Sequence, residues 1–274
     1  MRDYLVYTSA GHASNVRQWW SSADRNYDIW VTNYTDTPAL NSEYCEYYNE
    51  RKGSKFQNLK AVFETHHGLL AAYKGIMVAD DDIIMSPRTL SALLSLLKEH
   101  DLWVLQPAFS RFGKISHKIT ERQLSFALRY TNFVEVTCPV FRTDKLMDFL
   151  AVYRPELSTC YGIDWWFMAH FGTDQHERYA ISDRYYCTNP RDCFKPGRGR
   201  EIDQLGTHEQ RVAMWRTIER EVGVHSFRQR EYRRLRKRPL ERLACFPVFV
   251  AEVLFDDVFS ALSKFKRSLS TSGI

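Results

Sequence analysis

Apolar and polar positions alternate with two different periods along the first 110 residues. Short runs rich in β-forming residues recur at Tyr4–Thr8, Tyr27–Asn33, Gly75–Ala79 and Leu102–Leu105. Between them, apolar residues follow helical spacing at Asn15–Ala23, Asn58–Leu70 and Ser86–Leu97. Ser86-Pro87 suits the start of the last helix, because serine is a good N-cap and proline fits the first turn. Strands that alternate with helices through short connections predict a doubly wound, mainly parallel α/β sheet.

The second half of the chain has a less regular pattern. It predicts helices over 143–152, 161–171 and 207–222, and strands within 132–141 and over 178–187. Near the C-terminus, apolar residues recur at helical spacing on one face of a further helix: Leu243, Phe246, Val250, Leu254, Val258, Ala261 and Phe265. Glu252, Asp256 and Ser260 lie on another face, so this helix is amphipathic.

Composition places the chain among ordinary globular proteins. Of its 274 residues, 44% are hydrophobic and 26% are charged, which excludes collagenous, disordered and disulfide-scaffold classes. The six cysteines form no CxxC pair, which argues against a disulfide framework and a zinc ribbon. The N-terminal apolar run is too short for a signal peptide, and no apolar stretch is long enough for a spanning helix. We therefore expect a protein of the reducing cytoplasm.

The positive charge is concentrated in one segment. Between Arg228 and Arg242 there are eight Lys/Arg and two Glu, a net charge of +6, so the rest of a chain with net charge +5 carries −1. We expect a domain at 1–225 and a basic, amphipathic helical tail at 226–274. Such a tail suits an anionic membrane surface, on the inner face of the plasma membrane. The alternative is that its apolar stripe docks back on the domain. Charge confined to one tail does not indicate nucleic-acid binding.

Three consecutive carboxylates follow a predicted buried strand. Ile76–Ala79 leads directly into Asp80, Asp81 and Asp82. Side chains alternate along a strand, so Asp80 and Asp82 are predicted to point to the same side. Ligands of open α/β sheets bind beyond the carboxyl ends of the strands, and paired carboxylates suit Mg²⁺ or Mn²⁺ bound to a diphosphate. An acidic run that favours the start of the following helix is the structural alternative.

These residues resemble a known group of enzymes. Asp80–Asp82 matches the Asp-x-Asp signature of GT-A glycosyltransferases. Further blocks resemble the plant and bacterial family labelled "lysine-ketoglutarate reductase trans-splicing related", whose members are similar to GT-A enzymes. In the family's order and over roughly residues 4–190, they are Tyr27–Trp30, Lys52–Phe56, Val78–Ile83, Gln106–Ala108, Val134–Val136, Pro139–Phe141 and Tyr161–Asp164. The resemblance implies a GT-A-like fold and a nucleotide-sugar donor, with a UDP-sugar favoured.

The resemblance also implies roles for individual residues. The first strand and its loop would hold the nucleotide through Thr8, Ser9, Gly11 and Asn15, with a helix N-terminus beside the phosphates. Lys55, Asp80 and Asp81 would complete the donor site. Each assignment has a plain alternative, since Thr8–Gly11 also suits a turn and a lysine at a helix start is commonly solvated.

Asp164 is the predicted catalytic base, because it lies where GT-A enzymes place the acid that faces the acceptor. In inverting transferases this carboxylate takes the proton of the attacking hydroxyl, and apolar neighbours raise its pKa. A structural acid at a helix N-terminus is the alternative. Glu135, a lone polar residue in Val134–Val136, is the second candidate.

One metal ligand departs from the family pattern. Relatives carry a histidine after the late strand, where this chain has Cys187-Thr188. Cysteine binds Mg²⁺ poorly. The candidate ligands are Asp80 and Asp82, with His208 in place of the missing histidine. The alternatives are that Asp82 and the diphosphate alone hold the metal, or that the protein depends only weakly on a metal.

The favoured function is an inverting, metal-assisted glycosyltransferase that acts on a glycan or lipid-linked acceptor in bacterial surface polysaccharide or lipopolysaccharide synthesis. A nucleotidyltransferase or phosphohydrolase on a similar sheet is an alternative. A non-catalytic protein that binds a membrane or partner through its tail is another.

Overall fold

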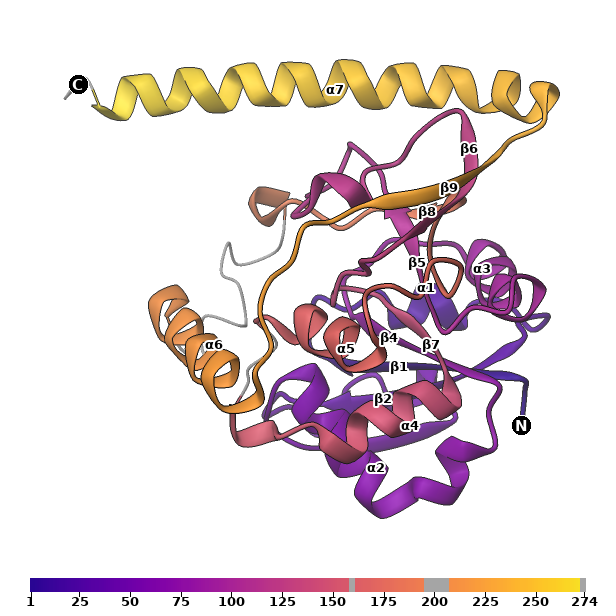
Figure 1. The fold of residues 1–274 in the computed structure, drawn as a ribbon, viewed down its shortest axis with the longest axis vertical. Coiled ribbons are helices and arrows are strands. Elements are labelled where there is room, and N and C mark those ends of the chain that lie inside the picture. Colours follow the sequence, from indigo (N-terminus) through magenta and orange to yellow (C-terminus); the bar gives the residue numbers. More distant parts are fainter. Residues whose placement is uncertain (158–160, 195–206, 272–274) are drawn as a thin grey trace.

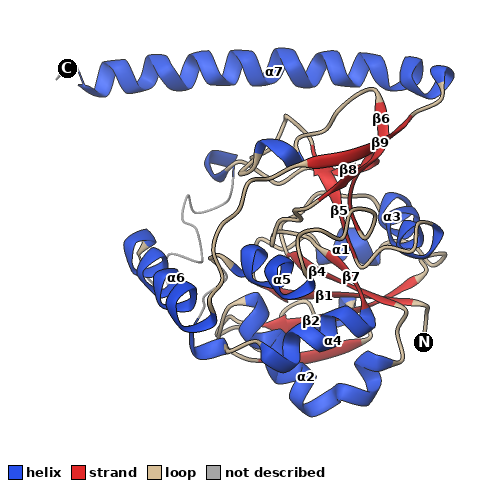
Figure 2. Ribbon diagram, viewed as in Figure 1, coloured by secondary structure: helices blue, strands red, loops and turns tan. Residues whose placement is uncertain are grey.

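The computed structural model describes residues 1–157, 161–194 and 207–271. Within these residues one nine-stranded sheet forms the centre of the molecule (Figures 1 and 2). Its strands are β1 (Tyr4–Ala10), β2 (Tyr27–Asn33), β3 (Tyr47–Glu50), β4 (Gly75–Asp80), β5 (Val104–Phe109), β6 (Phe126–Thr131), β7 (Val140–Arg142), β8 (Tyr179–Cys187) and β9 (Glu231–Arg236).

Helices surround the sheet. The α-helices are α1 (Val16–Trp20), α2 (Lys55–Ala71), α3 (Pro87–Glu99), α4 (Thr143–Val152), α5 (Ile163–Phe171), α6 (His208–Val222) and α7 (Pro239–Thr271). Short 3-10 helices are η1 (Ser42–Tyr44), η2 (Lys118–Thr120), η3 (Pro155–Leu157) and η4 (Asp192–Phe194).

The sheet is mixed but mainly parallel. Its strand order is β3-β2-β1-β4-β7-β5-β8-β6-β9. Strand β1 pairs in parallel with β2 and β4, and β5 pairs in parallel with β8. Strands β7 and β6 are antiparallel to their neighbours on both sides. The carboxyl ends of β1, β4, β5 and β8 therefore share one edge, which is where ligands bind in such sheets. The predicted fold class is confirmed.

Two apolar layers enclose the sheet, and the alternation of β1 shows why. Val6 packs on one face with residues of α1 and α3. Leu5 and Tyr7 pack on the other face with residues of α2, α4, α5 and α6. Because both faces are covered, the central strands are apolar throughout and their polar residues gather at the ends.

Three strands lie outside the sequence prediction, namely β3, β6 and β9. Strand β9 is made by the basic segment and pairs antiparallel with β6 at the edge of the sheet. Residues 231–236 are thus part of the sheet, although the predicted boundary between 225 and 226 assigned them to the tail. Within 132–141, where strands were expected, only the end enters β7 and the rest is loop.

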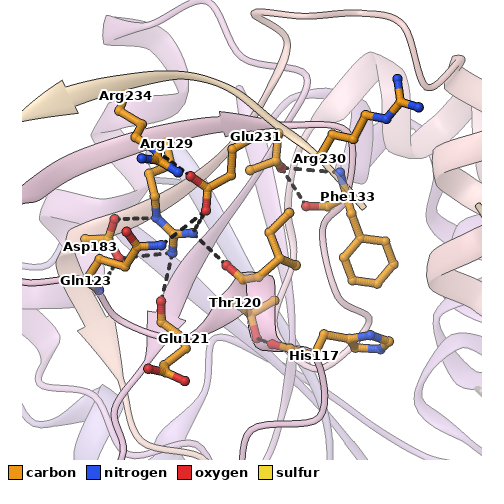
Figure 3. Close-up of polar contacts among 12 residues, drawn as sticks. His117, Thr120, Glu121, Gln123, Arg129, Phe133, Asp183, Arg230, Glu231 and Arg234 are labelled. Atoms are coloured by element: carbon orange, nitrogen blue, oxygen red, sulfur yellow. Dashed lines mark hydrogen bonds and ion pairs between the residues drawn. The ribbon is translucent and has the colours of Figure 1, made fainter. Parts of the chain in front are cut away.

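A buried arginine joins β9 to the sheet (Figure 3). Arg129 on β6 has no exposed surface. Its guanidinium donates to Asp183 on β8 at 2.7 and 3.1 Å and to Glu231 on β9 at 2.6 Å. It also donates to the backbone oxygens of Ile119 and Glu121, at 2.7 and 2.9 Å. A single side chain therefore fixes β9 and the loop around η2 in one arrangement.

The C-terminal helix α7 runs along one end of the molecule, with the other elements on one side of it (Figure 1). The predicted amphipathic helix is confirmed. Among the described residues no helix is long and apolar enough to span a membrane.

Candidate functional site

The carboxyl end of β4 carries the three consecutive aspartates. The strand ends at Asp80, and the N–H of Ile83 donates to the Asp80 carbonyl at 3.4 Å, so Asp81 and Asp82 lie in a turn. The alternation of a strand does not continue through a turn. Strand alternation therefore does not set the directions of Asp80 and Asp82, contrary to our expectation from the sequence. The turn holds the three carboxylates close together.

The loop after β1 holds this turn. The N–H of Gly11 donates to Asp81 Oδ2 at 2.9 Å, and the N–H of Asn15 donates to the Asp81 carbonyl at 2.7 Å. The side-chain amide of Asn15 donates to the Asp82 carbonyl at 2.7 Å. Desolvation raises the pKa of Asp81 to about 7, with further contributions from the charges of Asp82 and Asp80. Gly11 and Asn15 thus bind the acidic turn, and helix α1 beyond them is only five residues long.

Thr8 and Ser9 are both buried near the end of β1. Thr8 has no exposed surface, and its hydroxyl donates to the Ala79 carbonyl on β4 at 2.9 Å. This side chain therefore joins two strands, which corrects our expectation that it faces a nucleotide. The Ser9 hydroxyl accepts from Asn58 at 3.1 Å and lies nearer the edge of the sheet.

Lys55 is buried at the start of α2 and points at the acidic turn. Its ammonium donates to Asp80 Oδ1 at 2.7 Å and to the carbonyls of Val136 and Thr137 at 2.8 and 2.9 Å. An ammonium group has three N–H donors, so all three are used. Lys55 thus neutralises Asp80 and ties it to the 134–137 loop.

Asn58, one turn further along α2, was missed in the sequence. It has no exposed surface, and its amide bridges Ser9 Oγ and the carbonyls of Arg51 and Gly53, each at 3.1 Å. Its spacing of three residues from Lys55 puts both side chains on one face of α2. In the sequence, the available signal was a polar residue one helical turn from Lys55, and nothing there shows that it is buried.

Glu135 lies on the loop that Lys55 holds. Its side chain is buried, and its carboxylate accepts from the Thr137 hydroxyl at 2.8 Å. Desolvation raises the pKa of Glu135 to about 7, and the charges of Asp164 and Asp80 contribute to the rise. The second candidate base is therefore part of the same acidic cluster and does not lie on the exposed side of a strand.

Asp164 is buried in the first turn of α5 and faces the same loop. Oδ1 accepts from the N–H of Trp165 at 3.0 Å, and the N–H of Val136 also donates to this carboxylate. Desolvation outweighs these hydrogen bonds and raises the pKa of Asp164 to about 6. Trp165, half-buried, packs near it, whereas Trp166 is buried in the core and is not available to stack on a sugar ring.

His117 is a further residue that the sequence did not reveal. Its Nε2 lies 3.8 Å from Asp164 Oδ2, and its ring packs on Phe133 with centroids 4.7 Å apart. Burial lowers the pKa of His117, so the ring is neutral at pH 7. It comes just before η2, the segment that Arg129 anchors (Figure 3). No regular pattern in the sequence marks this loop.

The described residues do not gather the predicted metal ligands into one group. No set of three or more His, Cys, Asp or Glu side chains among them is placed to hold a metal ion. His208 begins α6, where its ring lies 5.8 Å from that of Tyr161. The prediction that His208 completes a set with Asp80 and Asp82 is therefore wrong for this structure. The carboxylates of Asp80 and Asp82 are still the hard oxygen donors that Mg²⁺ and Mn²⁺ prefer.

Together these residues form one acidic site with one buried cation. Lys55 and the β4 turn supply a place for a cationic or phosphate-bearing group. Glu135 and Asp164 supply two carboxyl groups whose pKa values lie near neutrality. Groups with such pKa values exchange protons readily at physiological pH, which is what general acid–base chemistry requires.

Comparison with solved structures relates this fold to a glycosyltransferase. The chain is similar to S. aureus TarS, a glycosyltransferase. With TarS 1–349 in complex with UDP-GlcNAc, the TM-score is 0.53 at 15% identity, over 83% of this chain and 68% of that one. With a longer TarS chain, the TM-score is 0.50 at 15% identity, over 75% of this chain and 39% of that one. In the comparison with another structure of TarS 1–349, this chain spans 60% of the length of that fragment. The chain thus has a glycosyltransferase-like fold.

No family model matches the chain, and no curated protein matches it. Membership of the family that the sequence blocks resemble therefore stays a prediction, whereas the mixed, mainly parallel α/β sheet flanked by helices is confirmed.

Proposed function

We propose that this protein is a sugar-nucleotide-dependent glycosyltransferase of the GT-A type. One observation carries the proposal. The Lys55–Asp80 pair lies close to the desolvated carboxyl groups of Glu135 and Asp164, at the edge of the sheet where the parallel strands end. The fold is similar to that of TarS, which was solved in complex with UDP-GlcNAc. We propose a UDP-sugar as donor and a glycan or lipid-linked molecule as acceptor. A bacterial surface polysaccharide or lipopolysaccharide pathway is proposed by analogy.

The proposed reaction is a single displacement with inversion. The acceptor hydroxyl oxygen forms a bond to the anomeric carbon while the bond from that carbon to the diphosphate oxygen breaks. The hydroxyl proton passes to the carboxylate of Asp164. With a pKa of about 6, Asp164 is mostly ionised at pH 7 and still basic enough to take a proton. Glu135 is the alternative base.

The donor would lie over the β4 turn. Asp80 and Asp82 would hold Mg²⁺ or Mn²⁺, with the donor phosphates supplying further oxygens, as Mg²⁺ sites in phosphate-binding enzymes do. Such an ion neutralises the diphosphate as it leaves. Lys55 contributes a fixed positive charge beneath the turn, and Ser9 and the backbone at Gly11 border the same space.

Ligand-dependent thermal unfolding tests the donor. Conjugates of UDP, GDP, CMP and dTDP are each titrated with and without Mn²⁺. We expect one nucleotide family, UDP, to raise the melting temperature, and Asp82→Ala to remove the part of the shift that depends on Mn²⁺. Flat curves with every donor would refute the proposal. Release of the sugar phosphate in place of UDP would favour a phosphohydrolase.

Asp164→Asn tests the base. It should leave the donor-induced thermal shift intact and lower UDP release by about 10²–10⁴-fold, the usual contribution of a general base. Asp148→Asn is the matched control, because that carboxylate lies on α4 with 59% of its side chain exposed. If Asp164→Asn turns over normally and Glu135→Gln does not, the base is Glu135.

A further inference from the structure

Helix α7 contacts the rest of the protein through its acidic face. Glu241 pairs with Arg184 at 2.6 Å, Glu252 with Arg122 at 2.9 Å, and Asp256 with Arg191 at 2.6 Å. These acids lie three turns and then one turn apart, so they share one side of the helix. The acidic face is therefore the face of α7 that docks on the rest of the protein.

Glu252 is the centre of this contact. Its side chain has no exposed surface, and Oε1 accepts from the Ser110 hydroxyl at 2.7 Å as well as from Arg122. Aromatic rings flank it on the same face. Phe255 packs on Phe112 with centroids 5.2 Å apart, and Arg191 lies over the ring of Phe259 at 4.1 Å. Because these contacts are directional, they fix the rotation of α7 about its own axis.

The apolar stripe of α7 therefore points away from the protein. Leu254 comes two residues after Glu252, which is about 200° around the helix. Leu243, Leu254 and Val258 are 70%, 60% and 60% exposed. Among the side chains of the helix that the structure describes, the other exposed large apolar ones are Leu240, Phe246, Val248, Val250 and Leu262. From 240 to 262 the stripe is about 33 Å long. The structure therefore contradicts the alternative that this stripe docks back on the domain.

The charges beside the stripe indicate what covers it. Three of the helix's four acids face the protein, and the fourth, Asp257, is exposed. Arg238 and Arg242 at its start are also exposed. The sequence places Lys264, Lys266 and Arg267 near its other end. Two copies of α7 packed face to face, parallel or antiparallel, would bring basic ends together. An anionic surface complements both ends at once.

We propose that α7 binds an anionic lipid surface, lying in its plane with the stripe from Leu240 to Leu262 buried among the lipids. The three arginine–carboxylate pairs hold the helix so that the remainder of the protein stays on the aqueous side. The inner face of the plasma membrane, which carries anionic lipids, fits this chemistry. The proposal does not depend on catalysis.

Co-sedimentation with vesicles tests the proposal in the full-length protein. We expect binding to vesicles of phosphatidylcholine with phosphatidylglycerol, weaker binding to phosphatidylcholine alone, and release from the anionic vesicles as salt screens the charges. Leu254→Asp with Val258→Asp should weaken binding by at least about tenfold, because both apolar contacts are lost.

Val152→Asp with Val222→Asp is the matched control. It introduces the same two charges at exposed valines on α4 and α6, and it should retain vesicle binding. Unchanged melting temperatures would show that both variants fold. Equal binding by both variants, or no binding by the unaltered protein, would overturn the proposal. Self-association that only Leu254→Asp with Val258→Asp abolishes, without vesicle binding, would assign the stripe to a second copy of the chain.

Discussion

At the scale of single residues, burial dominates the chemistry of the candidate site. Desolvation is the largest cause of the raised pKa values of Asp81, Glu135 and Asp164, at about 7, 7 and 6. Hydrogen bonds from Gly11, Thr137 and Trp165 oppose the rise at each carboxyl but do not cancel it. In the absence of a bound cation or substrate, these groups therefore make the protein less stable when they ionise.

Glu135→Gln should reverse part of this penalty. Glu135 has an ordinary pKa of 4.5 and a folded-state pKa of about 7. Between these values the folded state holds a proton that the unfolded state has lost, so stability falls as the pH rises through this window. Above about pH 7 the penalty is complete and amounts to about 3 kcal/mol.

Urea unfolding at about pH 5 and about pH 8 measures the effect. Glu135→Gln should be close to neutral at the lower pH and stabilising at the higher one, because Gln keeps the acceptor for Thr137. Glu156→Gln, an exposed acid on η3, is the control. If Glu135→Gln changed the free energy of unfolding by the same amount at both pH values, the result would contradict the proposed burial of an ionising carboxyl.

The sequence indicated some of these residues and not others, for a physical reason. Asp80 and Asp164 lie next to strand and helix ends that local patterns reveal. His117 and Asn58 gain their positions from partners distant in the chain, and the three acceptors of Lys55 are set by the 134–137 loop. Local periodicity carries no information on such contacts.

At the scale of elements, the basic segment and α7 depend on arginine–carboxylate pairs. Arg129 anchors β9, and Arg122, Arg184 and Arg191 anchor α7. The pairs of Arg129 and Arg122 are buried, whereas those of Arg184 and Arg191 are partly exposed. Buried pairs add little net stability but select one arrangement, since any other leaves a charge without its partner.

Glu252→Ala should release α7 while the sheet stays folded. Removing one partner of a buried ion pair costs about 3 kcal/mol or more, because Arg122 loses its carboxylate. We expect faster hydrogen exchange and faster trypsin cleavage within 238–267. Asp257→Ala, a change at a neighbouring exposed acid, should leave both rates unchanged. Equal rates of hydrogen exchange and trypsin cleavage in the two variants would show that Glu252 does not hold the helix.

At the scale of the whole molecule, we expect the boundary between domain and tail to lie after β9, because β9 pairs with β6 in the sheet. Truncation after Lys237 removes α7 and keeps β9. We expect a folded protein with its donor-induced thermal shift preserved. Truncation after Phe227 also removes β9, and the loss of Glu231 leaves Arg129 with one carboxylate fewer, which destabilises the sheet by about 3 kcal/mol.

Thermal unfolding of the two truncated proteins distinguishes the boundaries. The longer one should melt cooperatively near the temperature of the full chain, and the shorter one clearly lower. Similar melting of both would place β9 outside the folding unit and support the boundary between 225 and 226.

By itself, the sequence determined the order of the other strands and helices in the first 110 residues, but not strand β3. It also determined that three carboxylates follow β4 and that the tail is amphipathic. Each of these depends on periodicity or on neighbouring residues. Only the tertiary structure decided that the basic segment forms an edge strand, that His208 lies away from the carboxylates, and that α7 turns its apolar stripe outward. Hydrophobic periodicity shows that a helix has two faces, but ion pairs with distant arginines determine which face docks.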